Sequence, residues 1–153
     1  MTLDTRVNSA WWALRIGLGL GAFLAGLDKF FNLLTDWTMY LSPLATQVVP
    51  VSASTFMHVV GVVEMIVGLA VLTRWTRLSG YVMSGWLVAI AANLLTTGMF
   101  FDLAVRDVEI AIGAFVLARL TEVRQEALQS AAGRAPDNAA ADGPILRLGL
   151  AKY

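Results

Sequence analysis

Several residues with ionisable or amide side chains interrupt long apolar stretches of the sequence, among them Lys29, Glu64, Asn93 and Asp107. Glu64 lies nine residues from each end of the stretch 55–73, so on a helix it sits about 14 Å from either end. A charge at that depth in a bilayer costs about 2.5–3.5 kcal/mol on insertion scales. Glu64 is therefore either a proton site or ligand anchor, or one half of a buried structural pair.

Lys29 is the cation best placed to neutralise Glu64. Its side chain either extends outward to water or turns into the bundle, and we expect the inward direction because the bundle otherwise holds an excess of carboxylates. Gly61 and Gly68 lie at i−3 and i+4 from Glu64. Small residues at such spacings let two helices pack closely, so this face of the helix, with Glu64 on it, should point into the bundle.

Small residues also recur in two other apolar stretches. Gly17 and Gly21 form a G-x-x-x-G pair, with Asp28 seven residues further along the same face; this motif is common in membrane helices, and such a face suits binding of another protein. Around Asn93, small residues recur at four-residue steps. Asn93 therefore either joins neighbouring helices by hydrogen bonds or binds a ligand.

A charged group opens the last apolar stretch: Asp102, Arg106, Asp107 and Glu109. Asp102 and Arg106 are four residues apart with the acid first, which is the favourable order for a helical ion pair. Glu109 continues the Arg106 stripe, whereas Asp107 lies on a different face. Together with Asp28, these residues form either a salt-bridge network at the rim of the bundle or a charged vestibule that receives a polar headgroup.

The composition of the chain identifies its class. Hydrophobic residues make up 58% and charged residues only 14% of the 153 residues, against about 25% charged in a soluble domain. The eleven basic and eleven acidic residues cancel, so nothing favours nucleic-acid binding. With no cysteine and a single histidine, the chain offers neither a thiolate site nor a three-histidine zinc site. We expect no metal and no covalently bound cofactor.

Four stretches of about 20 residues match the length that a helix needs to cross the hydrocarbon core. We predict an all-α integral membrane four-helix bundle after a cytoplasmic segment at 1–10. The domain spans 11–120, with helices at about 11–34, 55–73, 78–100 and 103–120. Nine of the eleven basic residues fall on one side of this topology, which places both termini in the cytoplasm by the positive-inside rule. The expected location is a cell membrane of the bacterial inner-membrane type.

The segments outside these helices have distinct characters. The stretch 35–54 is too apolar for a loop in water, so we expect an interfacial segment that caps the outer end of the bundle. Within the cytoplasmic part 121–153, the helix is expected to continue through residue 132, followed by a flexible linker at 133–144. The apolar segment 145–153 either contacts the membrane or a partner, or is a disordered end.

The chain resembles the DoxX-like family of small four-helix membrane proteins. The resemblance covers most of residues 10–120 and rests on the order and spacing of short segments. These are RIGLGLG from Arg15 and GLDKF from Gly26, then GVVEMIVGL from Gly61, and finally NLL from Asn93 with Arg106-Asp107 ahead of a glycine-containing helix.

The resemblance implies a four-helix bundle with both termini inside. Members of the family are linked to membrane oxidoreductase systems, including a subunit of thiosulfate:quinone oxidoreductase, and to oxidative-stress complexes. A distant branch includes chaperones for membrane proteins. The polar positions that the family shares map here onto Lys29, Glu64, Asn93 and Asp107.

Three functions follow as hypotheses. The first is a subunit of a larger membrane-bound oxidoreductase, not catalytic alone and facing a quinone, with Glu64 as proton acceptor and Lys29 or Asn93 on a carbonyl oxygen. The second is a small-solute or proton-coupled transporter, which a midplane carboxylate suits. The third is a scaffold or assembly factor for membrane proteins. The expected partners are the lipid bilayer and either a protein in a membrane complex or further copies of this chain.

Overall fold

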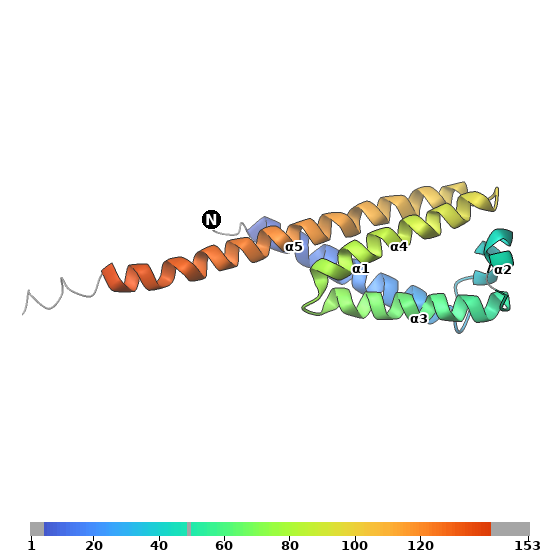
Figure 1. The fold of residues 1–153 in the computed structure, drawn as a ribbon, viewed down its shortest axis with the longest axis horizontal. Coiled ribbons are helices and arrows are strands. Elements are labelled where there is room, and N and C mark those ends of the chain that lie inside the picture. Colours follow the sequence, from blue (N-terminus) through green and yellow to red (C-terminus); the bar gives the residue numbers. More distant parts are fainter. Residues whose placement is uncertain (1–4, 49, 142–153) are drawn as a thin grey trace, which may run out of the picture.

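The computed structural model describes residues 5–48 and 50–141, in which every regular element is a helix. Four long helices are α1 (Thr5–Asp28), α3 (Ala53–Leu72), α4 (Thr76–Thr96) and α5 (Phe101–Ala141). Two short ones lie between α1 and α3, namely the 3₁₀ helix η1 (Trp37–Tyr40) and α2 (Pro43–Val48) (Figure 1). Helices α1, α3 and α4 are long and apolar enough to cross a membrane. The predicted all-α class is therefore confirmed for the described residues, and these three helices are candidate membrane spans.

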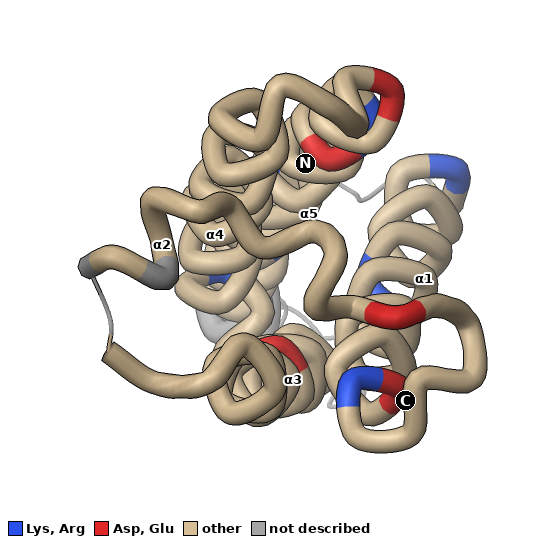
Figure 2. Tube along the Cα trace, turned by 90° about the vertical axis from the view of Figure 1, so that its right-hand side faces the viewer, with Lys and Arg blue, Asp and Glu red and all other residues tan. Residues whose placement is uncertain are grey.

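The long helices form two closely packed pairs, α1 with α3 and α4 with α5. Contacts between the pairs are fewer, and one apolar cluster joins them: Trp11, Val71, Met83, Ala114 and Leu117. We call the end covered by η1 and α2 the capped end, and the opposite end, beyond which α5 projects, the extended end (Figure 1). Seen from the capped end, the pairs lie on opposite sides, with the η1–α2 segment crossing in front (Figure 2).

Glycines allow α1 and α3 to touch backbone to backbone. A Cβ atom on Gly26 would lie 2.5 Å from the carbonyl oxygen of Gly61, and one on Gly68 would lie 2.7 Å from that of Gly19. No side chain fits at such a distance. The predicted packing face of Gly61 and Gly68 is therefore confirmed, and its partner is α1.

In the described part of the chain, the G-x-x-x-G pair of Gly17 and Gly21 does not pack against another helix. A Cβ atom at either position would meet no heavy atom within 4 Å. The contact face of α1 carries Gly19 and Gly26 instead. At about 100° per residue, Gly17 and Gly21 are turned some 200° away from Gly19. A G-x-x-x-G spacing identifies a shared face and does not say whether that face meets another helix.

Helix α1 also occupies a different range from the predicted 11–34. It begins at Thr5, inside the predicted N-terminal segment, and ends at Asp28. The backbone of Asn32 has a φ of 51°, and the Asp28 carboxylate accepts hydrogen bonds from the backbone N–H groups of Leu33 and Leu34. Asparagine tolerates the left-handed conformation, so the chain turns within a stretch whose hydropathy gives no sign of an end.

Helix α5 differs from the prediction in two ways. Its longest run without a charged residue is nine residues, at 110–118, so it is not among the helices apolar enough to span by themselves. It also continues to Ala141, through most of the predicted linker at 133–144. The tail is rich in alanine, the strongest helix former, which the linker prediction underweighted. The apolar segment 145–153 lies outside the described residues.

Candidate functional site

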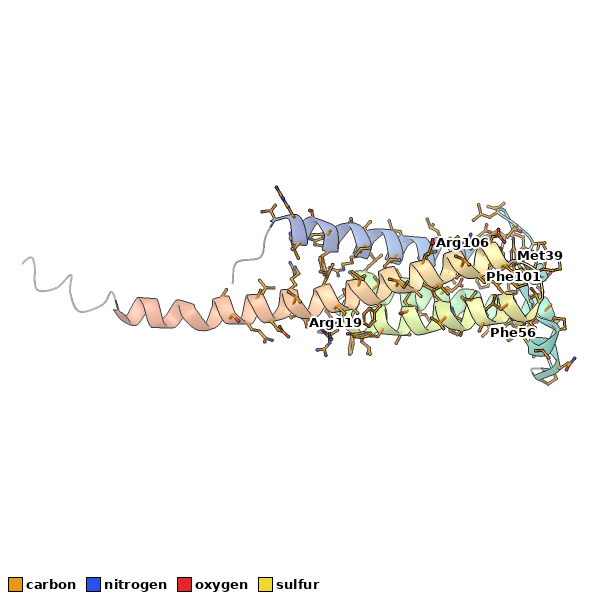
Figure 3. The ribbon with its side chains drawn as sticks, turned by 90° about the horizontal axis from the view of Figure 1, so that it is seen from above. Met39, Phe56, Phe101, Arg106 and Arg119 are labelled. Atoms are coloured by element: carbon orange, nitrogen blue, oxygen red, sulfur yellow. The ribbon has the colours of Figure 1, made fainter. Side chains whose placement is uncertain are left out.

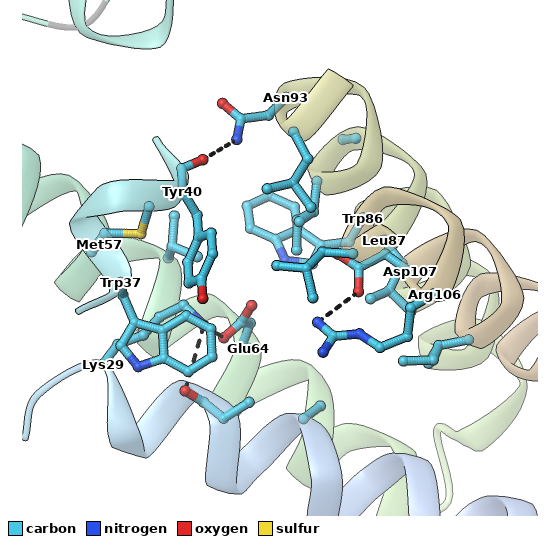
Figure 4. Close-up of a pocket in the computed structure, with 18 of the residues that line it drawn as sticks. Lys29, Trp37, Tyr40, Met57, Glu64, Trp86, Leu87, Asn93, Arg106 and Asp107 are labelled. Atoms are coloured by element: carbon cyan, nitrogen blue, oxygen red, sulfur yellow. Dashed lines mark hydrogen bonds and ion pairs between the residues drawn. The ribbon is translucent and has the colours of Figure 1, made fainter. Parts of the chain in front are cut away.

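A cavity of about 660 Å³ lies between the two helix pairs, toward the capped end. Its lining is mostly aliphatic and aromatic and comes from all four long helices and from the cap. The volume is within the range of small-molecule sites. Polar and aromatic side chains that could hold a ligand line it as well (Figure 4): Lys29, Trp37, Tyr40, Glu64, Trp86, Asn93, Arg106 and Asp107.

Lys29 and Glu64 form an ion pair on the wall of this cavity. The Nζ atom of Lys29 lies 2.5 Å from an oxygen of Glu64, and the two side chains are 5% and 11% exposed. The same ammonium lies 3.8 Å from the centre of the Trp37 ring and donates to the Ala25 carbonyl oxygen at 3.5 Å. The prediction that Lys29 turns inward onto Glu64 is therefore confirmed.

Asp28 does not line the cavity and supports it from behind. Its carboxylate accepts hydrogen bonds from the Leu33 and Leu34 N–H groups at 3.0 and 3.2 Å, and from Trp37 Nε1 at 2.8 Å. The buried acid thus ends α1, shapes the turn that follows and fixes the indole that covers Lys29. Its role is positional.

Asn93 fastens the cap to α4. Its side-chain oxygen accepts a hydrogen bond from the Ser42 N–H at 3.1 Å, and its Nδ2 donates to the Tyr40 carbonyl oxygen at 2.7 Å (Figure 4). Thr96 adds a hydroxyl contact to Ser42 at 2.9 Å. Asn93 therefore joins a helix to the cap, a third possibility beside the predicted helix–helix bond and ligand bond. Within the stretch 35–54, Tyr40 and Ser42 are thereby held against α4 at one end of the bundle.

Asp107 is buried and Arg106 is largely exposed, and their side chains meet at 3.3 Å. Both residues line the cavity, whereas the exposed Asp102 and Glu109 do not. Among the ion pairs of the described residues, Arg106 bonds Asp107, and the predicted pair with Asp102 is not formed. The side chain of Arg106 turns to the cavity rather than back along the helix. Of the charged residues at the start of α5, Arg106 and Asp107 thus form an ion pair at the cavity, whereas Asp102 and Glu109 lie outside it.

Trp86 is a polar group of the cavity that sequence reasoning missed, as are Trp37 and Tyr40. Its Nε1 atom is buried and makes no hydrogen bond of ordinary geometry, and the side chain lines the cavity together with Glu64. Figure 4 shows the indole beside Leu87 among the polar side chains of the cavity. Nothing in the sequence around Trp86 marks it, because aromatic residues are common in membrane helices.

His58 lies apart from this site. Its ring stacks on Phe30, with centroids 4.8 Å apart and planes 3° from parallel, and it does not line the cavity. Within residues 5–48 and 50–141, no group of three or more His, Asp or Glu side chains could hold a metal ion.

The cap itself begins at Asp36, which lies outside the long helices. The Asp36 carboxylate accepts hydrogen bonds from the Thr38 N–H at 3.0 Å and from the Thr38 hydroxyl at 2.7 Å. These bonds hold the pKa of Asp36 below its usual value. An ionised Asp36 thereby starts η1 as its N-cap.

Charge counting indicates what the cavity can hold. Its two cations and two carboxylates form two ion pairs, Lys29 with Glu64 and Arg106 with Asp107. No cavity charge is left over for an ionic headgroup, while the indole N–H of Trp86 offers a hydrogen bond to an acceptor. The arrangement suits a neutral head that accepts hydrogen bonds, attached to an apolar body.

Comparison of the chain with family models, with curated proteins and with solved structures finds no match.

Proposed function

We propose that the chain is a DoxX-like integral membrane subunit of a larger membrane-bound oxidoreductase, and that its cavity binds a quinone. In this proposal the chain has no redox centre of its own, and a partner subunit supplies or removes the electrons. One observation carries the proposal: an apolar cavity of about 660 Å³ has polar walls that are neutral overall and present a buried donor without a full partner.

A quinone fits this site better than a charged lipid does. Its ring oxygens are neutral hydrogen-bond acceptors and its isoprenoid tail is apolar. A phospholipid headgroup would bring a charge that the two existing ion pairs do not compensate, and burying such a charge is expensive. Trp86 Nε1 would donate to one ring oxygen.

Glu64 is the group placed to handle a proton. Oxidation of a quinol releases two electrons, which pass to the partner, and two protons, which leave the ring oxygens. Glu64 takes one of these protons while Lys29 remains beside it, and Asp107, the other carboxylate that lines the cavity, takes the second. Reduction of a quinone runs both transfers backward. The ion pair of Glu64 with Lys29 supports this assignment, as does the position of Glu64 in the same cavity lining as Trp86.

The topology in this proposal has four spans with both termini in the cytoplasm of the cell. Helix α5 packs along α4, with Gly80 close to the backbone of Ala114 and the side chain of Ala118. The capped end carries Met39, Phe56 and Phe101, whereas Arg119 lies toward the extended end (Figure 3). Arginines gather at the extended end, which favours its placement in the cytoplasm: Arg15, Arg74, Arg77, Arg119 and Arg124.

The proposal is tested on protein purified from its membrane in mild detergent. Mass spectrometry of co-purifying proteins and of extracted quinones comes first. Isothermal titration then compares three probes that share a decyl chain and differ in the head: a benzoquinone, a carboxylate and a trimethylammonium. We expect the benzoquinone to bind at least about tenfold more tightly than either ion, because the cavity charges are already paired.

Two variants report on the donor. Trp86→Phe removes the indole N–H, and we expect about three- to tenfold weaker benzoquinone binding, the range for one lost hydrogen bond. Trp75→Phe is the matched control, since Trp75 is exposed and lies outside the cavity. A preparation that holds no quinone, binds no benzoquinone probe and brings down no redox partner would overturn the proposal.

A further inference from the structure

Three lining residues of the cavity also face the outside of the bundle. Gly21 on α1 and Arg106 and Ile110 on α5 line the cavity and are exposed. Arg106 and Ile110 are four residues apart, as are Gly21 and Ala25, which also lines the cavity. Each helix therefore contributes a stripe of one turn to the same seam. Leu34 and Ala89 are exposed lining residues too, but each stands singly, on the cap and on α4.

The seam between α1 and α5 is fastened at the extended end. Trp11 Nε1 donates to Thr121 at 2.7 Å, and Arg124 lies over the Trp11 ring and donates to Asn8 at 3.2 Å. These contacts join α1 directly to α5. Toward the capped end, a Cβ atom on Gly21 would meet nothing within 4 Å.

We propose that this part of the seam is a lateral portal through which a membrane-dissolved ligand enters the cavity from the lipid. The portal is the gap flanked by Gly21, Arg106 and Ile110. Gly21 keeps it open because glycine brings no side chain, and the Arg106 guanidinium stands at its edge, bound to the Asp107 carboxylate inside. The identity of the ligand rests on the proposed function, whereas the route does not.

The chain contains no cysteine, so a single introduced thiol reports on the route. We would place it at Leu87, which lines the cavity from α4, and measure its reaction with a lipid-soluble maleimide in nanodiscs. Gly21→Phe should slow this reaction at least about fivefold by filling the portal. Gly17→Phe is the matched control, because Gly17 lies one turn away on the same face, has equally open surroundings and does not line the cavity.

A second pair of variants covers the case in which Gly21→Phe fails to fold. Ile110→Trp fills the portal from α5, and Ile112→Trp places the same side chain on an exposed position outside the cavity. Slower labelling in Ile110→Trp alone supports the portal. Equal labelling rates within each pair of variants would overturn it.

Quinone binding on the same variants separates this inference from the proposed function. A filled portal slows both entry and exit, so the equilibrium affinity for the decyl benzoquinone should stay within about twofold of the parent value. If the parent protein binds no benzoquinone but Gly21→Phe still slows maleimide labelling, the proposed function fails and the portal stands. If benzoquinone binds and exchanges equally fast in Gly21→Phe and Gly17→Phe, the portal alone fails.

Discussion

Lys29 and Glu64 are two charges that an apolar bundle tolerates only together. Removing one partner of a buried ion pair typically costs about 3–5 kcal/mol, since the other charge is left uncompensated, while replacing both with apolar residues is often neutral or stabilising. We therefore expect Lys29→Met to lower the free energy of unfolding strongly, and Glu64→Leu likewise. The double variant should recover most of the loss. Thermal unfolding in detergent would measure all three.

Arg119→Met provides the comparison for this cycle. Arg119 also forms an ion pair, with Glu122 at 2.6 Å, but its side chain is 61% exposed. Water screens such a pair, so this substitution should change the unfolding temperature little. Additive losses in the Lys29→Met/Glu64→Leu variant would contradict the buried pair.

The residues of the site were predictable to the extent that charge in an apolar stretch is expensive. Lys29, Glu64 and Asp107 stand out in the sequence for this reason, Asn93 stands out as a polar amide among apolar residues, and all four line the cavity. Trp86 could not be found in the same way, because an indole is at home among apolar side chains. The four-residue spacing of Asp102 and Arg106 also failed to predict their ion pairing. Spacing shows which side chains can meet, but it does not show which way each side chain turns.

At the scale of the helix, the contact of α1 with α3 depends on atoms that are absent. Gly61→Ala would place a Cβ atom 2.6 Å from the Gly26 carbonyl oxygen, and backbone cannot move aside as a flexible side chain can. We expect a loss of about 1–3 kcal/mol, as for other overpacked sites, measured by thermal unfolding. Gly85→Ala is the control, because its Cβ atom meets nothing within 4 Å and alanine favours a helix.

The cap is held as an element by the amide of Asn93. Asn93→Leu leaves the Ser42 N–H and the Tyr40 carbonyl oxygen without their partner, and such buried groups cost about 1–3 kcal/mol each. The cap should then open more often. Chymotrypsin cleavage at Trp37 and Tyr40 should accelerate at least about fivefold. Unchanged cleavage would show that other contacts hold the segment.

Asn8→Leu is the control for the cap, because Asn8 lies at the extended end, where it accepts a hydrogen bond from Arg124.

Element boundaries show why the sequence could not predict the cap in detail. Apolar residues resume after Asp28 and Lys29 and continue to Leu34, whereas the turn depends on the left-handed Asn32 and on hydrogen bonds of the Asp28 carboxylate. The existence of a capping segment followed from composition, but its two short helices did not.

At the scale of the whole molecule, the main question is how a helix with a charged beginning takes part in a membrane bundle. Helix α5 spans 41 residues, so at about 1.5 Å per residue it is roughly twice as long as the hydrocarbon core is thick. Its charged first turns lie at the capped end, and Asp107 is shielded from lipid by Arg106 and the cavity walls. Its packing partner α4 is itself long and apolar enough to span. We therefore expect pairing with α4 to carry α5 across the same layer.

This argument makes the number of spans a measurable property. If α5 crosses the membrane, Ser9 and Ala132 lie on the same side and Gln47 lies on the opposite one. The cysteine-free chain allows single substitutions Ser9→Cys, Gln47→Cys and Ala132→Cys, each at an exposed position. In intact spheroplasts we expect a membrane-impermeant maleimide to label Gln47→Cys, and to label the other two only after the membrane is opened. Labelling of Ala132→Cys together with Gln47→Cys would instead mean three spans, with the projecting part of α5 outside the cytoplasm.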